Sequence, residues 1–332
     1  MNTKKTVSLG AAMVGVAGFA AAYRAFRRDM DRAVARISES QVVQTAHGAV
    51  EYASVGKGFP LLIIHGAGGG FDQLRSFDSD FRLSELGFRL IFVSRFGYLR
   101  TPLPTDASTR AQADAYAGLL DAVGIGQAGV IAVSAGAPSG LEFAARYSQR
   151  CAALVLLVPA AFVPGLAATE PGVPPLMQLF RETLLKSDFA FWAAIKLARG
   201  ALIENILATP LEVANRASEP ERIRTDKVLM DILPVSRRAA GLLNEAEVVT
   251  HMQPAEVGRI RCPTLLVSTE DDLYGTARSA RYLAGQIPGA RLVVYPDGGH
   301  LWLGHEAELQ RELTEFLRPV GATVSQSASL PA

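Results

Sequence analysis

The chain has 332 residues, and its 33 lysines and arginines nearly balance its 32 aspartates and glutamates, for a formal net charge of +1. Because these charges are unclustered outside the N-terminus, the composition argues against a nucleic-acid-binding surface. Hydrophobic residues make up 49% of the chain, which is long enough for one large globular domain with an insertion.

Residues 1–38 form a separate segment. An uncharged, mostly apolar run from Val7 to Tyr23 follows two lysines and is followed at once by arginines. We predict a single uncleaved membrane anchor, a transmembrane helix with a linker helix after it. Slightly more positive charge lies on the C-terminal side, which favours a cytoplasmic location for the rest of the chain. The alternatives are a cleaved signal peptide of an exported protein, with its site at Ala20 to Ala22, and a soluble helix.

The pattern after this segment is that of a layered α/β domain. Gln41 to Gly56 alternates apolar and polar residues around Gly48, which predicts a hairpin of edge strands. Beyond it, apolar strands alternate with helical segments such as Arg110 to Val123. This alternation predicts a mainly parallel sheet with helices on both faces.

A glycine run follows the apolar strand at Pro60 to Ile64. It reads His-Gly-Ala-Gly-Gly-Gly over residues 65–70. Backbone N–H groups approach an anionic oxygen closely only where side chains leave room, so the run predicts an oxyanion loop. A phosphate loop is the alternative, but the G-x-G-x-x-G spacing and an acidic ribose ligand about twenty residues on are missing. We therefore predict no nucleotide cofactor.

A serine lies at a turn between strand and helix. The apolar strand from Gly129 runs into Ala132-Val-Ser134-Ala-Gly136. At a nucleophile elbow, the residues two before and two after the serine must be small because the turn is tight and strained. Ala132 and Gly136 meet that demand, although alanine replaces the first glycine of G-x-S-x-G. A tight connection with an incidental serine is the alternative interpretation.

The alternation of strands and helices stops after the strand at Cys151 to Val158. Residues 159–261 are helical in pattern and punctuated by prolines, which predicts a helical cap inserted after the sixth strand. Most of its apolar residues would form the core of the cap, and a few would line an apolar pocket that faces the serine. The apolar residues of its two helical runs, which include both groups, are Leu176, Met177, Leu179, Phe180, Phe189, Phe191, Trp192, Ile195 and Leu197.

Acidic residues and a histidine end the last two predicted strands. The strand from Thr264 runs into Glu270, Asp271 and Asp272, and the strand from Arg291 leads into Asp-Gly-Gly-His300. The acid therefore precedes the histidine by about 28 residues, and both follow the serine. This chain order, Ser, Asp, His, differs from the orders in chymotrypsin and subtilisin.

With these motifs, the chain resembles the α/β-hydrolase superfamily, and in particular its bacterial cap-bearing members, over roughly residues 41–318. The stretches at 93–102 and 301–305 are also similar to that family. The resemblance implies a mainly parallel eight-stranded sheet whose core consists of residues 39–158 and 262–318. Residues 319–332 are expected to form a disordered tail.

The resemblance also implies a catalytic triad. By position, Ser134 would be the nucleophile and His300 the base, and the backbone N–H groups of Ala67 and Ala135 would form the oxyanion hole. Counting from the end of the strand at Thr269 gives Asp272 as the triad acid, with Asp271 as its rival.

The sequence predicts no metal site, because neither an H-E-x-x-H nor a C-x-x-C spacing is present. Cys151 and Cys262 each precede a strand, and those two strands would be neighbours. We expect two buried thiols there, with a disulfide as the alternative.

The implied activity is that of a serine esterase, which cleaves a carboxylic ester of a medium-sized hydrophobic substrate through an acyl-enzyme. Serine at the elbow argues against dehalogenase and epoxide hydrolase chemistry, which needs a carboxylate nucleophile. The first alternative is a lactone or carbon–carbon bond hydrolase with the same triad. The second is a non-catalytic, membrane-tethered binding protein. The sequence leaves the oligomeric state open.

Overall fold

The computed structural model describes residues 3–73, 75–165 and 184–327, and the side chains of 17–73, 77–165 and 184–321. Its centre is an eight-stranded sheet with the order β1-β2-β4-β3-β5-β6-β7-β8. Strand β2 pairs antiparallel with β1 and β4, and the other neighbours are parallel. The predicted mainly parallel sheet is confirmed. Its strands are β1 (Gln41–Thr45), β2 (Gly48–Gly56), β3 (Phe59–Ile64), β4 (Phe88–Val93), β5 (Ala128–Val133), β6 (Cys151–Leu157), β7 (Thr264–Thr269) and β8 (Arg291–Tyr295).

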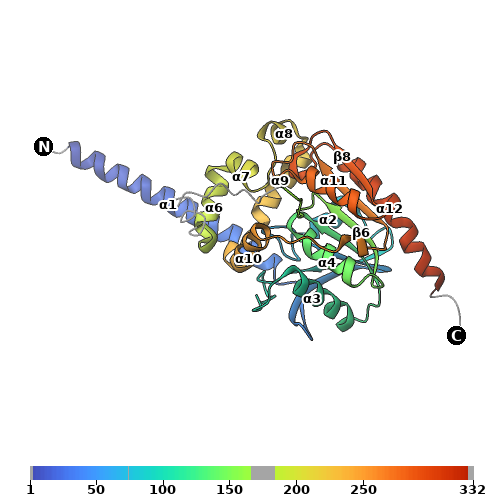
Figure 1. The fold of residues 1–332 in the computed structure, drawn as a ribbon. Helices are drawn as coiled ribbons and strands as arrows, with labels where there is room; N and C mark the ends of the chain where they lie inside the picture. The colour runs from blue at the N-terminus through green and yellow to red at the C-terminus, as the bar shows by residue number, and fades with distance from the viewer. Residues whose placement is uncertain (1–2, 74, 166–183, 328–332) are drawn as a thin grey trace.

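Helices cover both faces of the sheet (Figure 1). On one face lie α3 (Thr109–Ala122), α4 (Ala137–Arg146) and α11 (Thr276–Gln286), and on the other lie α2 (Arg75–Phe81) and α12 (Glu306–Ser327). Successive strand residues point to opposite faces, so Leu62 packs in the first core and Leu61 in the second. Both are fully buried, which explains why β3 reads as a continuous apolar run.

A helical insertion separates β6 from β7, as predicted. It contains α6 (Asp188–Leu197), α7 (Arg199–Asn205), α8 (Leu211–Arg216), α9 (Glu219–Asp231) and α10 (Ala239–Thr250). Phe191, Trp192 and Ile195 are buried in the core of this cap, as expected. Leu197 is instead 88% exposed, because it ends α6 on the side away from that core. The expected core residues at 176, 177, 179 and 180 lie outside the described residues.

The long helix α1 (Thr3–Arg36) packs its second half on the cap, beside α6 (Figure 1). The Phe26 ring contacts those of Phe189 and Trp192, and the Trp192 indole N–H donates to Asp29 over 3.0 Å. Among the described residues, no helix is both long enough and apolar enough to cross a membrane, so the predicted transmembrane anchor is not supported.

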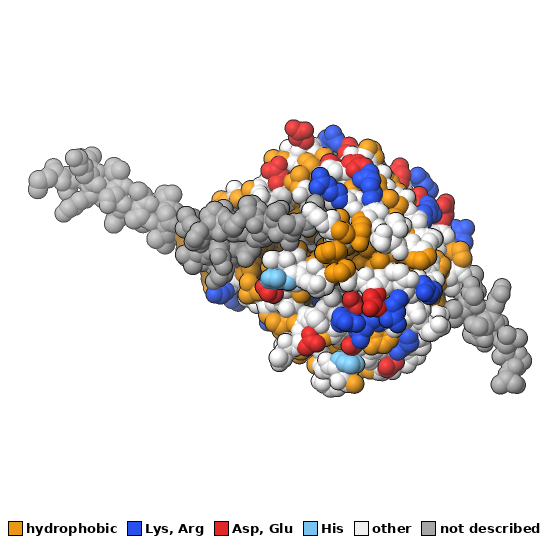
Figure 2. Space-filling model, in the orientation of Figure 1, with side chains coloured by type: hydrophobic (Ala, Val, Ile, Leu, Met, Phe, Trp, Pro, Cys, Tyr) orange, Lys and Arg blue, Asp and Glu red, His pale blue; other side chains and the backbone are white. Residues whose placement is uncertain are grey.

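The C-terminal helix α12 extends to Ser327, beyond residue 319, where a disordered tail was expected to begin. Val320, the second residue of this stretch, packs against the second core. Residues 328–332 lie outside the described part of the chain. On the face seen in Figure 2, acidic and basic side chains are interspersed, in line with the balanced composition.

Candidate active site

Ser134 lies in a strained turn between β5 and α4. Its φ is +51°, in the left-handed region that non-glycine residues rarely adopt. The turn is close to the end of β3: a Cβ on Gly136 would lie 2.6 Å from the main-chain oxygen of His65, and one on Gly66 would lie 3.0 Å from the Ser134 Cβ. The local structure therefore requires glycine at Gly136, and it leaves little room for a side chain at Gly66.

The alanine that departs from the G-x-S-x-G pattern fits because its neighbour on α4 is glycine. Ala132 is fully buried, and a Cβ on Gly140 would lie only 2.8 Å from the Ala132 methyl. One methyl group thus occupies the space between strand and helix, and a second would not fit there.

The structure brings Ser134, His300 and Asp272 together in one hydrogen-bonded chain. The Ser134 Oγ lies 2.8 Å from His300 Nε2, and His300 Nδ1 lies 2.7 Å from Asp272 Oδ2. All three residues are at least nine-tenths buried. They come from the carboxyl ends of β5, β8 and β7, which meet at one edge of the sheet. With Nδ1 donating to the carboxylate, Nε2 is free to accept the serine proton.

Asp271 and Asp272 make different contacts, so the geometry distinguishes the two candidate acids. Asp272 also accepts a hydrogen bond from the Tyr274 N–H over 2.9 Å, which orients its carboxylate. Asp271 accepts from the backbone N–H groups of Gly298 and Gly299 over 3.3 and 2.8 Å. Asp271 therefore holds the loop that carries His300 instead of contacting the imidazole.

The glycine-rich loop after β3 lies directly against the nucleophile. Gly66 approaches Ser134 closely, since a Cβ on Gly66 would lie 3.0 Å from the Ser134 Cβ and 3.6 Å from its Oγ. Ala135, a predicted oxyanion donor, lies in the turn from Ser134 to Gly136. Ala67 follows Gly66 and Ala135 follows Ser134 in the chain, and the role of their backbone N–H groups as oxyanion donors stays a prediction.

His65 holds the start of this loop as a neutral ring. Its Nδ1 lies 2.7 Å from the Gly66 carbonyl oxygen, and its Nε2 accepts from the Arg95 backbone N–H over 3.0 Å. Burial, and then the charge of Arg95, hold the pKa of His65 well below its usual range. The proton of the neutral ring is therefore on Nδ1.

Three residues that the sequence analysis did not assign to the site extend this arrangement into the cap. The Arg95 guanidinium, after β4, forms a buried ion pair with Glu245 of α10. The Tyr98 hydroxyl donates to the same carboxylate. The cap can approach here because Gly241 packs against the Tyr98 ring, where a Cβ would lie 2.3 Å from ring atoms. No local pattern could have paired residues 150 positions apart.

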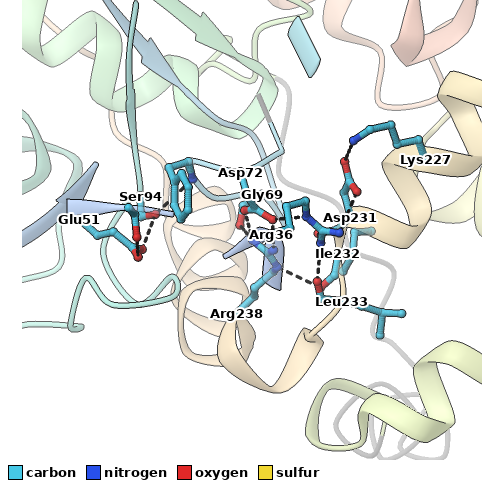
Figure 3. Close-up of polar contacts among 12 residues, drawn as sticks. Arg36, Glu51, Gly69, Asp72, Ser94, Lys227, Asp231, Ile232, Leu233 and Arg238 are labelled. Atoms are coloured by element: carbon cyan, nitrogen blue, oxygen red, sulfur yellow. Dashed lines mark hydrogen bonds and ion pairs between the residues drawn. The ribbon is translucent and has the colours of Figure 1, made fainter. Parts of the chain in front are cut away.

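A second buried ion network joins α1, the glycine-rich loop and the cap (Figure 3). Asp72 accepts from Arg238 over 2.8 Å and from Arg36 over 2.8 Å, and Arg238 also donates to the Gly69 carbonyl oxygen. Burial alone would raise the pKa of Asp72, but the two guanidinium groups outweigh it, and the pKa is lowered. Apart from Gly69, which belongs to the predicted oxyanion loop, these residues were not predicted as part of the site.

Within the described residues, no cluster of three or more histidine, cysteine, aspartate or glutamate side chains is arranged to hold a metal ion. Cys151 and Cys262 are free buried thiols whose sulfur atoms lie 3.5 Å apart. A cavity of about 450 Å³ separates α10 from α4 and α11, with Leu141, Val248 and Tyr282 in its wall. Its described lining includes neither Ser134 nor His300, so it is distinct from the triad.

Comparison with known proteins decides the family. A sequence model of the alpha/beta hydrolase fold matches residues 60–304, which include the serine, both acids and the histidine. The chain belongs to this family.

This hydrolase is similar to characterised and uncharacterised relatives alike. It is 28% identical over 275 residues to the uncharacterized hydrolase YcgS of Bacillus subtilis (strain 168), covering 78% of this chain and 91% of the relative. It is 26% identical over 280 residues to a 2-hydroxy-6-oxononadienedioate/2-hydroxy-6-oxononatrienedioate hydrolase of Burkholderia vietnamiensis (strain G4 / LMG 22486), covering 81% and 91%. A solved alpha/beta hydrolase fold protein from Nakamurella multipartita is 28% identical, with a TM-score of 0.65 and 84% and 99% of the two chains covered.

Proposed function

We propose that this protein is a serine hydrolase that cleaves a carboxylic ester of a medium-sized hydrophobic substrate through an acyl-enzyme. The observation that carries the proposal is the buried chain of hydrogen bonds from Ser134 through His300 to Asp272. A serine hydroxyl becomes a nucleophile when an adjacent base can take its proton and a third group orients that base. All three groups stand within hydrogen-bonding distance in this site.

In the proposed mechanism, His300 takes the proton of Ser134 as the hydroxyl oxygen attacks the substrate carbonyl. Asp272 keeps the imidazole in the required tautomer and stabilises it once it is charged. His300 then gives the proton to the departing alcohol. Water repeats the sequence and releases the acid.

The backbone N–H groups of Ala67 and Ala135 would stabilise the negative charge on the former carbonyl oxygen. This assignment is supported by the close approach of Gly66 to Ser134 and by the position of Ala135 in the elbow. No metal or cofactor is part of the proposed mechanism. The substrate would be held between the cap and the edge of the sheet that carries the triad.

A second candidate is hydrolysis of a carbon–carbon bond in a vinylogous diketone. It is favoured by the Burkholderia vietnamiensis relative, whose name states hydrolysis of 2-hydroxy-6-oxo dienedioates and trienedioates, which are substrates of this chemical type. A lactone would be opened by the same groups. The triad serves all three reactions, so the walls of the cap site would select among them.

Two assays on the intact chain test the proposal. The first asks whether the serine is activated, and the second separates the candidate reactions. Labelling by a fluorophosphonate probe, lost in both Ser134→Ala and His300→Ala, would support an activated serine. Turnover of p-nitrophenyl esters of graded acyl length is then compared with turnover of lactones and of a vinylogous diketone. We expect the largest kcat/KM for a medium-length ester. A parent protein that does not label, while a known esterase does, would contradict the proposal.

The cytoplasmic location of the domain stays a prediction.

A further inference from the structure

The peptide group between Gly66 and Ala67 has one end at the proposed oxyanion hole and the other end in a buried polar cluster. Its N–H belongs to Ala67, a proposed oxyanion donor. Its carbonyl oxygen lies 2.7 Å from His65 Nδ1 and accepts from the Arg95 guanidinium over 3.2 Å. Two donors, one of them charged, thus bind the carbonyl of this single peptide group.

The other arm of the same guanidinium reaches the nucleophile elbow. Arg95 donates to the carbonyl oxygen of Ala135 over 3.1 Å. One planar side chain therefore joins the two segments that carry the proposed oxyanion donors, the loop after β3 and the turn after β5. The fixed geometry of a guanidinium, with its donors in one plane, sets the spacing between these segments.

The position of Arg95 is in turn set by the cap. Its ion-pair partner, Glu245, lies on α10 and is 6% exposed, and Tyr98 donates to the same carboxylate. Burial alone would lower the pKa of Arg95, but Glu245 outweighs it and raises the pKa, so the guanidinium is charged. The ion pair with Glu245 thus holds the positive charge of Arg95 behind the proposed oxyanion hole.

We propose that Arg95 is a positioning residue of the oxyanion hole and that Glu245 makes its placement depend on docking of the cap. The inference rests on the proposed function. Hydrogen bonds to a peptide carbonyl polarise the whole amide, so the Ala67 N–H becomes a stronger donor when Arg95 and His65 bind the Gly66 oxygen. The benefit appears only when negative charge develops on the substrate oxygen, so it acts on kcat and not on ground-state binding.

The test uses the double variant Arg95→Met/Glu245→Gln, which removes the guanidinium without leaving an unpaired buried charge. The matched control is Arg100→Met, because Arg100 also binds a buried carboxylate, that of Glu51, but contacts neither Gly66 nor Ala135. Melting temperatures of both variants are measured first. The readouts are kcat and KM for a p-nitrophenyl ester, the rate of fluorophosphonate labelling and the affinity for a trifluoromethyl ketone.

We expect the double variant to lose about 10- to 100-fold in kcat, somewhat less than removal of a direct oxyanion donor. Its affinity for the trifluoromethyl ketone, which forms an oxyanion on the serine, should fall by a similar factor, while KM stays within threefold. If kcat falls no more than in Arg100→Met, or if KM rises as much as kcat falls, the inference is overturned.

Two further observations keep the test decisive. If the double variant does not fold, Arg95→Lys replaces it, because an ammonium group keeps the charge but lacks the planar fork that spans both carbonyls. A lower kcat at constant KM supports the inference, and an unchanged kcat refutes it. Failure of the parent to label would refute the proposed function itself, whereas a labelled parent with an unaffected Arg95 variant would refute only the role of Arg95.

Discussion

Asp271 and Asp272 are adjacent in the sequence, but one contacts the main chain of the loop that carries the histidine and the other contacts the histidine ring. Asp272 lies 2.7 Å from the His300 ring, and Asp271 accepts from the backbone N–H of Gly299 over 2.8 Å. One carboxylate is thus placed to act on the imidazole, and the other fixes the main chain that presents it.

Replacement of these two acids should therefore have different effects. We expect Asp272→Asn to lower kcat by about 10³- to 10⁴-fold, because the imidazole loses the partner that sets its tautomer. Asp271→Asn should retain kcat within about tenfold and lower the free energy of unfolding by about 1 kcal/mol. Ester hydrolysis and urea unfolding measure the two effects. Equal losses of kcat in both variants would contradict the assignment of the acid.

Gly136 should not tolerate even one methyl group. Its Cβ would lie 2.6 Å from the main-chain oxygen of His65, the residue that follows β3, so the backbone itself would have to shift. We expect Gly136→Ala to lower the free energy of unfolding by about 2 kcal/mol or more and to displace Ser134. Gly126→Ala is the control, since nothing lies within 4 Å of its Cβ position. Chemical denaturation that finds the two variants equally stable would refute this account of the elbow.

The buried His65 ring should make the stability of the protein depend on pH. Its pKa lies well below the usual range when the chain is folded, so the unfolded chain takes up a proton as pH falls through about 6.5 and the folded chain does not. The contribution is fully present above that pH and is lost as pH falls toward the folded pKa. Between pH 7.5 and 5.0 the loss should be about 2 kcal/mol.

Urea unfolding of the parent and of His65→Asn at these two pH values checks this expectation. The variant lacks the titrating ring, so its free energy of unfolding should fall by about 2 kcal/mol less than that of the parent. The exposed His47 serves as the control, and His47→Asn should behave like the parent. A pH dependence that is the same in all three proteins would count against a neutral, buried His65.

The second half of α1 should be part of the folded hydrolase. Removal of residues 1–38 deletes Phe26, Asp29 and Arg36, and with them the contacts to Trp192 and Asp72. We expect this truncation to lower the free energy of unfolding by about 3 kcal/mol or more, since it breaks a buried ion network. Removal of residues 1–16 leaves all of these contacts in place and serves as the control.

Thermal unfolding and ester hydrolysis of both truncations and of the full chain test the role of this helix. Arg36→Met in the full chain separates the polar contacts of Arg36, with Asp72, Asp231 and Leu233, from the apolar packing of α1. If the chain without residues 1–38 melts at the same temperature as the full chain, α1 is an appendage with no part in stability.

The sequence by itself was enough to predict the parts of the molecule that rest on local patterns. Apolar strands alternating with helices predict the parallel sheet, and small residues around Ser134 predict the elbow, because a tight turn excludes side chains. Ser134, Asp272 and His300 each follow a predicted strand, so each group is expected at the carboxyl end of a strand. Parallel strands bring these ends to one edge, so the serine, the histidine and a choice between two acids could be predicted before the geometry was known.

Tertiary structure alone decided what depends on packing between distant segments. The count along the chain left Asp271 and Asp272 as rivals, and only the direction of each carboxylate in space distinguishes them. The pairing of Arg95 with Glu245 and that of Arg238 with Asp72 join residues more than a hundred positions apart. A buried charge needs a partner, but the partner is set by how the cap docks on the sheet, and no sequence spacing specifies that docking.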